Sequence, residues 1–410
     1  MAIEAIQARE AAHFLPVVNR LPVAIVEGRG SRVRDADGRE LLDLTAGWGV
    51  CSIGHCHPEL VAAIGEQAGR LMQTTNLFYT LPQLALIERL AELSGETLAR
   101  TFIVNSGTEA VDGVLKLAHR ATGRVRFVST DNSFHGRTLG ALQVIGQAKH
   151  RDPYKALLRD QTVVPFGDLE AAHAEVDDAT AAFIVEPIQG EGGVNVAPPG
   201  YLAGLRDVCR ERGALLIFDE IQTGIGRTGD WFAWQHEGVV PDAMTLGKGL
   251  GGGFPVGAFV CTEQVAKTVS LGDHGGTYVG NPLACAAANA VLHVVDRDAL
   301  VARSAELGKR LGARLAAFAA EHPDRALGAR GRGLLQGLVL ADVERAATLS
   351  RRAIDEGVLL NVTAGRVARF FPALNIPEDE LWDALDVGEH EALEEAAAAR
   401  AESAVGVLRG

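Results

Sequence analysis

Two nearby stretches, Ala214-Leu-Leu-Ile-Phe-Asp219-Glu-Ile-Gln222 and Pro241-Asp-Ala-Met-Thr-Leu-Gly-Lys248-Gly-Leu-Gly-Gly-Gly253, each join a short apolar run to polar residues. Each apolar run has the length and composition of a buried strand, and the polar residues that follow would lie where that strand ends. The sequence therefore predicts an acidic side chain, Asp219, at one strand end and a lysine, Lys248, in a glycine-rich bend after the next strand.

Five further apolar runs of the same kind occur along the chain, with helical or loop segments between them, at 101–104, 125–128, 162–165, 182–185 and 256–260. Helical patterns include 108–121 and 201–212. Strands that alternate with helices indicate an α/β fold, a mostly parallel sheet covered by helices on both faces. Ligands of such sheets bind at the carboxyl ends of the strands, where Asn105, Glu186, Asp219 and Lys248 would lie.

Asp219 and Lys248 together indicate one kind of chemistry. A lysine amine can form a Schiff base with the aldehyde of pyridoxal 5'-phosphate (PLP). A carboxylate can keep the pyridine nitrogen of that cofactor protonated, so that its ring accepts electrons. The sequence therefore predicts a PLP-dependent enzyme.

A phosphate site is suggested by Asn105-Ser-Gly-Thr-Glu-Ala110, which joins a strand to a helix. Ser106, Gly107 and Thr108 would lie at the helix N-terminus, where backbone N–H groups bind phosphate. The alternative is ordinary helix capping by the same residues. Thr277, in a glycine-rich turn, could add a hydroxyl to the phosphate site or could simply be part of a β-turn.

Two other motifs could contact a cofactor ring and a substrate. In Ser133-Phe-His-Gly-Arg-Thr138, Phe134 could stack on a flat ring and Arg137 could bind a carboxylate. Glu186-Pro-Ile-Gln-Gly-Glu-Gly-Gly193 offers a carboxylate that could pair with a guanidinium. Taken alone, 133–138 is more typical of a core phenylalanine and a solvated arginine. Taken alone, 186–193 is more typical of a loop with two surface acids.

The main rival function rests on Gly224-Ile-Gly-Arg-Thr-Gly229, which matches the G-x-G-x-x-G pattern of nicotinamide-dependent dehydrogenases. That fingerprint should join a first strand directly to a helix. Here residues 219–223 separate it from the strand, Trp231-Phe-Ala-Trp234 follows it, and it lies in the middle of the chain. A dehydrogenase is therefore a remote alternative.

The composition limits the partners. The chain has 410 residues and a formal net charge of −13, which argues against nucleic acid as the main partner. No apolar run is long enough to cross a membrane, and the N-terminus lacks the basic start and apolar stretch of a signal peptide. Five cysteines, a low and odd number for this length, fit a reduced, cytoplasmic setting.

Cys51-Ser-Ile-Gly-His55-Cys-His-Pro58 contains residue types that bind zinc. Its spacing does not match the usual paired-ligand patterns, and no second cluster follows downstream. We expect a structural turn there and no metal site.

In this order, the motifs resemble the class III (ω-type) PLP-dependent aminotransferases, and within that family acetylornithine and succinylornithine aminotransferases most closely. The resemblance extends from about residue 20 to about residue 375. The segments that carry it are Gly54-His-Cys-His-Pro58, 105–110, 133–138, 186–193, 218–224, 226–229, 246–253 and Gly280-Asn-Pro-Leu-Ala284.

The resemblance implies fold type I of the PLP-dependent transferases, with a mostly parallel seven-stranded sheet in a large domain and a smaller α+β domain built from both chain ends. We expect the small domain at residues 1–60 and 296–410 and the large domain at 61–295. It also implies a homodimer whose active sites lie at the interface.

The family's functional residues correspond to positions of this sequence. Lys248 would be the Schiff-base lysine and proton shuttle, and Asp219 the partner of the pyridine nitrogen. The other cofactor contacts would come from Ser106, Gly107, Thr108, Phe134, Ile221, Gln222 and, across the dimer interface, Thr277. The substrate contacts would come from the carboxylate-binding Arg137 and Arg369, from Glu191, which pairs with Arg369, and from Tyr79 and Trp48.

The implied reaction moves the ω-amino group of N2-acetylornithine to 2-oxoglutarate, giving N-acetylglutamate semialdehyde and glutamate, in arginine biosynthesis. Trp48 stands where ornithine enzymes of the family commonly have tyrosine and acetylornithine enzymes a small aliphatic residue. Succinylornithine, acetyl-lysine, ornithine and 4-aminobutyrate therefore remain alternative donors. A regulator with an aminotransferase-like domain would need a DNA-binding module, for which the sequence shows neither a spare segment nor a basic patch.

Overall fold

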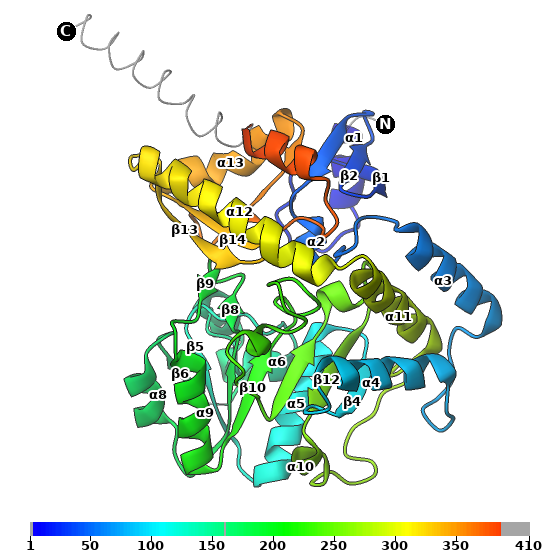
Figure 1. Ribbon diagram of the computed structural model, residues 1–410, viewed down its shortest axis with the longest axis vertical. Helices are drawn as coiled ribbons and strands as arrows, with labels where there is room; N and C mark the ends of the chain where they lie inside the picture. The colour runs from blue at the N-terminus through cyan, green and yellow to red at the C-terminus, as the bar shows by residue number, and fades with distance from the viewer. Residues whose placement is uncertain (1–2, 160, 387–410) are drawn as a thin grey trace, which may run out of the picture.

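The computed structural model describes residues 3–159 and 161–386. Figure 1 shows a lower half built around one large sheet and an upper half that holds smaller sheets. The first strands of the chain and the segments after residue 300 share the upper half, whereas the middle of the chain forms the lower half.

The large sheet has seven strands, and the seven apolar runs predicted from the sequence all lie in it. Its order is β4 (Arg100–Val104), β12 (Gly257–Cys261), β11 (Ala243–Leu246), β10 (Leu215–Asp219), β7 (Thr180–Val185), β5 (Arg126–Thr130) and β6 (Thr162–Val164). Only β12 runs antiparallel to its neighbours. The expected mostly parallel α/β sheet is confirmed.

Both faces of this sheet are buried. Successive residues of its strands point to opposite faces and belong to two different apolar clusters. Ile217 packs in one cluster with α5 (Gly107–Thr122), and Phe218 packs in the other with α9 (Tyr201–Arg212). The Phe218 cluster also includes helices α3 (Pro58–Arg70), α4 (Leu81–Leu93), α8 (Leu169–Glu175) and α11 (Pro282–Arg297). Strands buried on both faces are apolar throughout, which explains why they were easy to recognise in the sequence.

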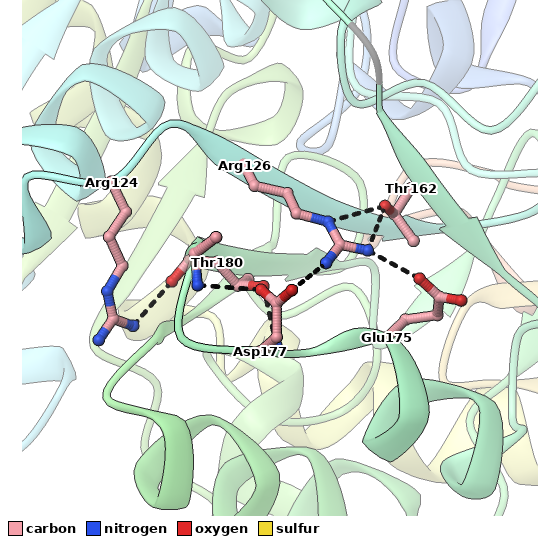
Figure 2. A network of polar contacts seen from close by, with 7 residues as sticks. Arg124, Arg126, Thr162, Glu175, Asp177 and Thr180 are labelled. Atoms are coloured by element: carbon pink, nitrogen blue, oxygen red, sulfur yellow. Dashed lines mark hydrogen bonds and ion pairs between the residues drawn. The ribbon is translucent and has the colours of Figure 1, made fainter.

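A network of polar contacts joins the amino ends of three strands (Figure 2). From β5, Arg126 donates hydrogen bonds to the Thr162 hydroxyl and to the carboxylates of Asp177 (2.5 Å) and Glu175 (2.7 Å). Arg124 donates to the Thr180 carbonyl at 3.0 Å. These contacts tie β5, β6 and β7 together at the end of the sheet opposite the one where ligands bind in such folds.

The upper half contains two four-stranded sheets. One has the order β1 (Ile25–Arg29), β2 (Arg32–Asp35), β3 (Glu40–Asp43) and β15 (Val358–Leu359), and the other β13 (Ala326–Arg332), β14 (Leu335–Leu340), β17 (Val367–Phe370) and β16 (Asn361–Thr363). Since β3 pairs with β15, the N-terminal strands pack on the C-terminal part of the chain. Helices α12 (Leu300–Glu321) and α13 (Val343–Asp355) pack on these sheets.

The remaining elements are short, apart from the nine-residue α1 (Ile3–Ala11). They are α2 (Ala46–Gly49), α6 (Leu139–Leu142), α7 (Ala148–Arg151), α10 (Glu263–Ala266), the 3-10 turns η1 (Asp152–Leu157), η2 (Ala233–His236) and η3 (Lys248–Leu250), and the pair β8 (Ile188–Gln189) and β9 (Asn195–Val196). Among the described residues, no helix is both long and apolar enough to cross a membrane. The sequence also predicts an amphipathic helix at 378–401, of which residues 387–401 lie outside the described residues.

Candidate active site

The centre of the site is Asp219, the last residue of β10, whose side chain is buried. One carboxylate oxygen, Oδ1, accepts hydrogen bonds from the Thr245 hydroxyl at 2.9 Å and from the Ile221 N–H at 3.1 Å. The other, Oδ2, lies 2.6 Å from Nδ1 of His135. These contacts fix the carboxylate in one orientation at the carboxyl end of the central strand.

Lys248 begins η3, directly after β11, and its backbone has a φ of 43°, in the left-handed region that non-glycine residues rarely adopt. No hydrogen bond or ion pair links its amine to another described residue. Burial lowers the pKa of Lys248 below its usual range, Arg369 lowers it further, and the carboxylates of Glu191, Glu186 and Asp219 oppose both effects. A strained backbone and an amine without a partner are features of functional lysines.

The loop that leads into α5 lies against both of these elements. Ser106 is the N-cap of α5, and its hydroxyl accepts from the Glu109 N–H at 3.3 Å. A Cβ built on Gly107 would lie 2.7 Å from Cδ1 of Ile221, so any larger residue there would displace the Ile221 side chain. A Cβ on Gly247 would lie 3.3 Å from the Gly107 Cα, which places the residue before Lys248 beside this helix N-terminus.

The hydroxyl of Thr108 lies 3.0 Å from that of Thr138, which in turn donates to Asp112 at 3.0 Å. Thr108 therefore already has a protein partner, unlike the simple phosphate contact that the sequence suggested. Although Ser106 caps the Glu109 N–H, the N–H groups of Gly107 and Thr108 and the positive end of the helix can still bind an anion.

Arg369, on β17, is fully buried and faces this site from the upper half of the molecule. Its Nη1 donates to Glu191 at 2.6 Å and to the Gln222 side chain at 3.1 Å, and its Nη2 donates to Asn361 at 2.8 Å. Burial alone would raise the pKa of Glu191, but the charges of Arg369 and Lys248 hold it below its usual range. The predicted pairing of Arg369 with Glu191 is thus present, and Gln222 joins it.

Phe134 and Arg137 lie close together, as the motif suggested. The Arg137 guanidinium is 5.5 Å from the Phe134 ring centre, and its Nη2 is 3.3 Å from Nε2 of His150. The Phe134 N–H donates to the buried Glu186 carboxylate at 2.9 Å. Arg137 is exposed and forms no ion pair with a described residue, so its guanidinium remains available to a carboxylate.

Three predicted residues are not joined to this cluster. Tyr79 and Trp48 are exposed, and Trp48 lies in a turn whose backbone is left-handed from Ala46 to Gly49. Thr277 is exposed too, and its carbonyl accepts from Gln73. No hydrogen bond or ion pair joins these three side chains to the described residues of the cluster, although the turn that holds Trp48 packs against η3, which begins at Lys248.

The structure adds residues that sequence reasoning missed. His135 was quoted only as part of a motif, yet it contacts Asp219, and Thr245 and Asn361 were not considered. Glu186 is a buried acid, not the surface acid favoured by its motif alone. A signal was available for two of them: a polar residue, Thr245, inside an apolar strand, and a histidine directly after the predicted stacking residue.

The cluster at residues 51–58 is a turn in which His55 pairs with Asp43 at 2.8 Å. No group of three metal-ligating side chains occurs within residues 3–159 and 161–386. The G-x-G-x-x-G segment is followed by turns and η2 and does not open a helix, so it lacks the geometry of a dinucleotide site.

The geometry fits PLP. The buried Asp219 carboxylate can meet a protonated ring nitrogen, the helix N-terminus at Gly107 can bind a phosphate, and the Lys248 amine has no other partner among the described residues. These three groups come from neighbouring elements, since Gly247 and Ile221 both lie against Gly107. The arrangement provides one place for each functional part of the cofactor.

Comparison with known proteins gives the same answer. The family model "Aminotransferase class-III" matches residues 15–390. An acetylornithine aminotransferase from Methanopyrus kandleri is 46% identical over 373 residues, 91% of this chain and 95% of that protein.

Solved structures agree over nearly the whole fold. An ornithine aminotransferase from Toxoplasma gondii superimposes with a TM-score of 0.92 at 33% identity, covering 97% of this chain and 96% of the other. An acetylornithine aminotransferase from Elizabethkingia anophelis gives 0.84 at 32% identity, covering 96% and 100%. The match extends through both halves of the molecule, and the chain belongs to the class III aminotransferases, enzymes that use PLP.

Proposed function

We propose that this aminotransferase moves the ω-amino group of N2-acetylornithine to 2-oxoglutarate, giving N-acetylglutamate semialdehyde and glutamate. The similarity to acetylornithine aminotransferases supports this donor, with 46% identity in one case. The ornithine aminotransferase of Toxoplasma gondii has a higher TM-score, 0.92, than the acetylornithine aminotransferase of Elizabethkingia anophelis, 0.84. Its identity to this chain, 33%, is lower than the 46% of the Methanopyrus kandleri acetylornithine aminotransferase. We give more weight to identity, because one fold supports several substrates and the side chains of the site choose between them.

The cofactor would be held by side chains and backbone groups from several elements of the large sheet and its helices. Asp219 would face the ring nitrogen, and Ser106, Gly107 and Thr108 would bind the phosphate. Phe134 and Ile221 would cover the ring, and Gln222 would meet its hydroxyl. When bound, PLP supplies an electron-accepting ring that stabilises negative charge on the carbon that bears the amine.

Lys248 would move the proton in this reaction. Because burial lowers its pKa, its amine Nζ is a better base near neutral pH than an exposed lysine would be. No described residue competes for this nitrogen, so it can reach the proton on the carbon that bears the donor's amine. Lys248 is therefore the proposed acid and base.

Arg369 and Glu191 would let one site accept two kinds of substrate. Paired at 2.6 Å, their charges cancel, and the donor can enter with its ω-amine first. Glutamate and 2-oxoglutarate carry a carboxylate that can replace Glu191 on Arg369, while Arg137 binds the other carboxylate. The second partner of Arg369, Asn361, keeps the guanidinium in place when Glu191 moves away.

We also infer a homodimer. Large apolar side chains are exposed on residues 71–84 and 269–278, among them Leu77, Phe78, Tyr79, Leu271 and Tyr278. Monomeric proteins rarely expose so much apolar surface in one region, and a second copy of the chain would cover it. Thr277 lies within the second of these segments, where it could contact the phosphate of the partner subunit.

The domain limits at residues 60 and 295 remain a proposal. The pairing of β3 with β15 and the start of α12 at Leu300 support them. The cytoplasmic location is likewise still a prediction, based on the cysteine content.

The donor can be tested in a single half-reaction. The PLP-loaded protein would be mixed, without 2-oxoglutarate, with acetylornithine, succinylornithine, acetyl-lysine, ornithine or 4-aminobutyrate, and the loss of the bound-cofactor absorbance followed in a stopped-flow instrument. We expect acetylornithine to react fastest. If another donor is clearly faster, the proposed substrate is wrong and Trp48 is the first residue to substitute. If no donor reacts, the proposed reaction itself is wrong.

A further inference from the structure

His135 is a fully buried histidine that the proposed reaction does not use. Its side chain has no exposed surface, and its Nδ1 lies 2.6 Å from Oδ2 of Asp219. Its other ring nitrogen, Nε2, is buried and has no hydrogen-bond partner within the described residues. An unsatisfied polar nitrogen in the interior lowers stability. The contact of His135 with Asp219 is kept in spite of this cost, which indicates a functional role.

The contact is specific to one oxygen of Asp219. Oδ1 already has two donors, the Thr245 hydroxyl and the Ile221 N–H. Among the described residues, Oδ2 is contacted by His135 alone. Because a carboxylate oxygen can accept only, Nδ1 must carry the hydrogen in either protonation state of the ring. His135 thus decides where Oδ2 lies.

Glu186 provides a second negative charge near the same ring. Its carboxylate is buried and accepts from the backbone N–H groups of Phe134 at 2.9 Å and Gly190 at 3.3 Å. Burial opposes a positive charge on His135, but Asp219 and Glu186 overcome this and raise the pKa of the imidazole. Burial raises the pKa of Glu186 to about 7, a shift that His135 opposes and Asp219 adds to.

We propose that His135 is a positioning residue for the aminotransferase reaction, which acts through Asp219 by fixing the orientation and the negative charge of the carboxylate that faces the cofactor. The negative charge of Glu186 partly balances the positive charge of the His135 imidazolium. This inference rests on the proposed role of Asp219. Charged groups near the cluster also include Lys248, whose amine is not hydrogen-bonded to His135, Asp219 or Glu186. They include the buried Glu220 too, whose carboxylate accepts from the Thr223 hydroxyl and the Trp234 N–H and interacts electrostatically with Asp219.

The physical reason is electrostatic. Two carboxylates buried close together would favour taking up a proton, and a protonated Asp219 would no longer stabilise a protonated ring nitrogen. The imidazolium of His135, bonded to Asp219 and close enough to Glu186 to interact with its charge, restores the balance. Removing it should weaken cofactor binding and slow the reaction, but should leave substrate affinity largely unchanged.

A double-mutant cycle tests this directly. The dissociation constant of PLP would be measured by fluorescence titration of the apoprotein for the wild type, His135→Asn, Asp219→Ala and the double variant. Asparagine keeps a neutral donor near the position of Nδ1, so it removes mainly the charge. We expect His135→Asn to weaken PLP binding about tenfold in the wild-type background and less than about twofold when Asp219 is absent.

Ser133→Ala is the matched control. Ser133 is buried two residues away and bonds to the Gly146 N–H at 2.9 Å, without contact to Asp219. It should lower Tm with no change in PLP affinity. In the loaded enzyme, His135→Asn should lower kcat about tenfold, keep KM within about threefold, and shift the pH dependence of the bound-cofactor absorption. A merely structural role of His135 would lower Tm and change none of these.

The outcomes separate the two proposals. If Asp219→Ala leaves PLP affinity unchanged, the proposed role of Asp219 fails and the inference about His135 fails with it. If Asp219→Ala weakens binding but His135→Asn has the same effect in both backgrounds, only the inference is overturned. If His135→Asn does not fold, the same cycle is run with Glu186→Gln. A rise of about threefold in the dissociation constant of PLP that disappears in the Asp219→Ala background supports the proposal, and equal rises in both backgrounds contradict it.

Discussion

Arg126 and Arg369 show how differently the two ends of the molecule's central sheet use the same side chain. At the amino ends, Arg126 is partly exposed and each of its three nitrogens has a partner (Figure 2). Facing the carboxyl ends, Arg369 is fully buried, and its Nε has no partner among the described residues. Of these two arginines, the one that joins strands of the fold is fully satisfied, and the one that faces the candidate site retains a donor that is free within the described part of the chain.

Exposed ion pairs contribute about 0–1 kcal/mol each, whereas breaking a buried pair costs about 3–5 kcal/mol. The amino-end network should therefore affect stability slightly and activity not at all. The carboxyl-end groups should affect activity strongly, and stability only where a buried partner loses its pair.

The largest effect is expected at Lys248. Lys248→Ala should lower kcat by at least about 10³-fold, because proton transfer at the donor carbon depends on this amine. Since the amine has no partner within the described residues, the Tm of the apoprotein should not fall. Steady-state kinetics and calorimetry check the two halves of this prediction. A variant that keeps more than a tenth of the activity would mean that another group moves the proton.

The next largest effect is expected at Arg369. Arg369→Ala should raise the KM for 2-oxoglutarate about a hundredfold, because the paired hydrogen bonds to the substrate's carboxylate are lost. The variant should also have a lower Tm, because Glu191 and Asn361 lose their partner. Arg126→Ala is the control at the other end of the sheet and should leave this KM unchanged. An equal rise of KM in both variants would remove the distinction between the two ends.

A smaller effect is expected at Arg126. Arg126→Ala should reduce the free energy of unfolding by about 1 kcal/mol, because its contacts to Thr162, Glu175 and Asp177 lie near solvent. Urea unfolding of the variant, with kcat/KM measured in parallel, checks this. A loss of several kcal/mol, or a change in kcat/KM beyond twofold, would show that the two ends are coupled.

The smallest effect concerns His55, which belongs to neither end. Its hydrogen bond to Asp43, with Cys51 nearby, raises its pKa to about 10 against the opposing effect of burial. A raised folded-state pKa stabilises the fold fully below the ordinary value near 6.5, and this contribution is lost as the pH rises towards 10.

The difference in Tm between the wild type and Asp43→Asn should therefore shrink between pH 7 and pH 10. Scanning calorimetry across this range measures it. A constant difference would mean that the charge of His55 does not contribute.

Much of this comparison could be predicted from the sequence, for a physical reason. The strands of the central sheet are buried on both faces, so their apolar runs and the polar residues that end them are visible in one dimension. Lys248 and Asp219 were found in this way. The edge strand β13, rich in glycine and arginine, and the largely exposed β1 carry no such run and were missed.

The supporting contacts could not be predicted, because they join positions far apart in the chain. His135 meets Asp219 across 84 residues. Arg369 reaches Asn361 by the pairing of β16 with β17, a register that the sequence does not reveal. Residues that touch a ligand often belong to recognisable motifs, whereas the residues that position them depend on tertiary packing.

Lys248 is the residue to which the cofactor would be covalently attached. Holoenzyme reduced with sodium borohydride would be digested with protease and the peptides identified by mass spectrometry. We predict a phosphopyridoxyl group on the peptide that contains Lys248 and on no other lysine peptide. Attachment to a different lysine, such as Lys116 or Lys149, or no attachment after complete cofactor loading, would contradict the account.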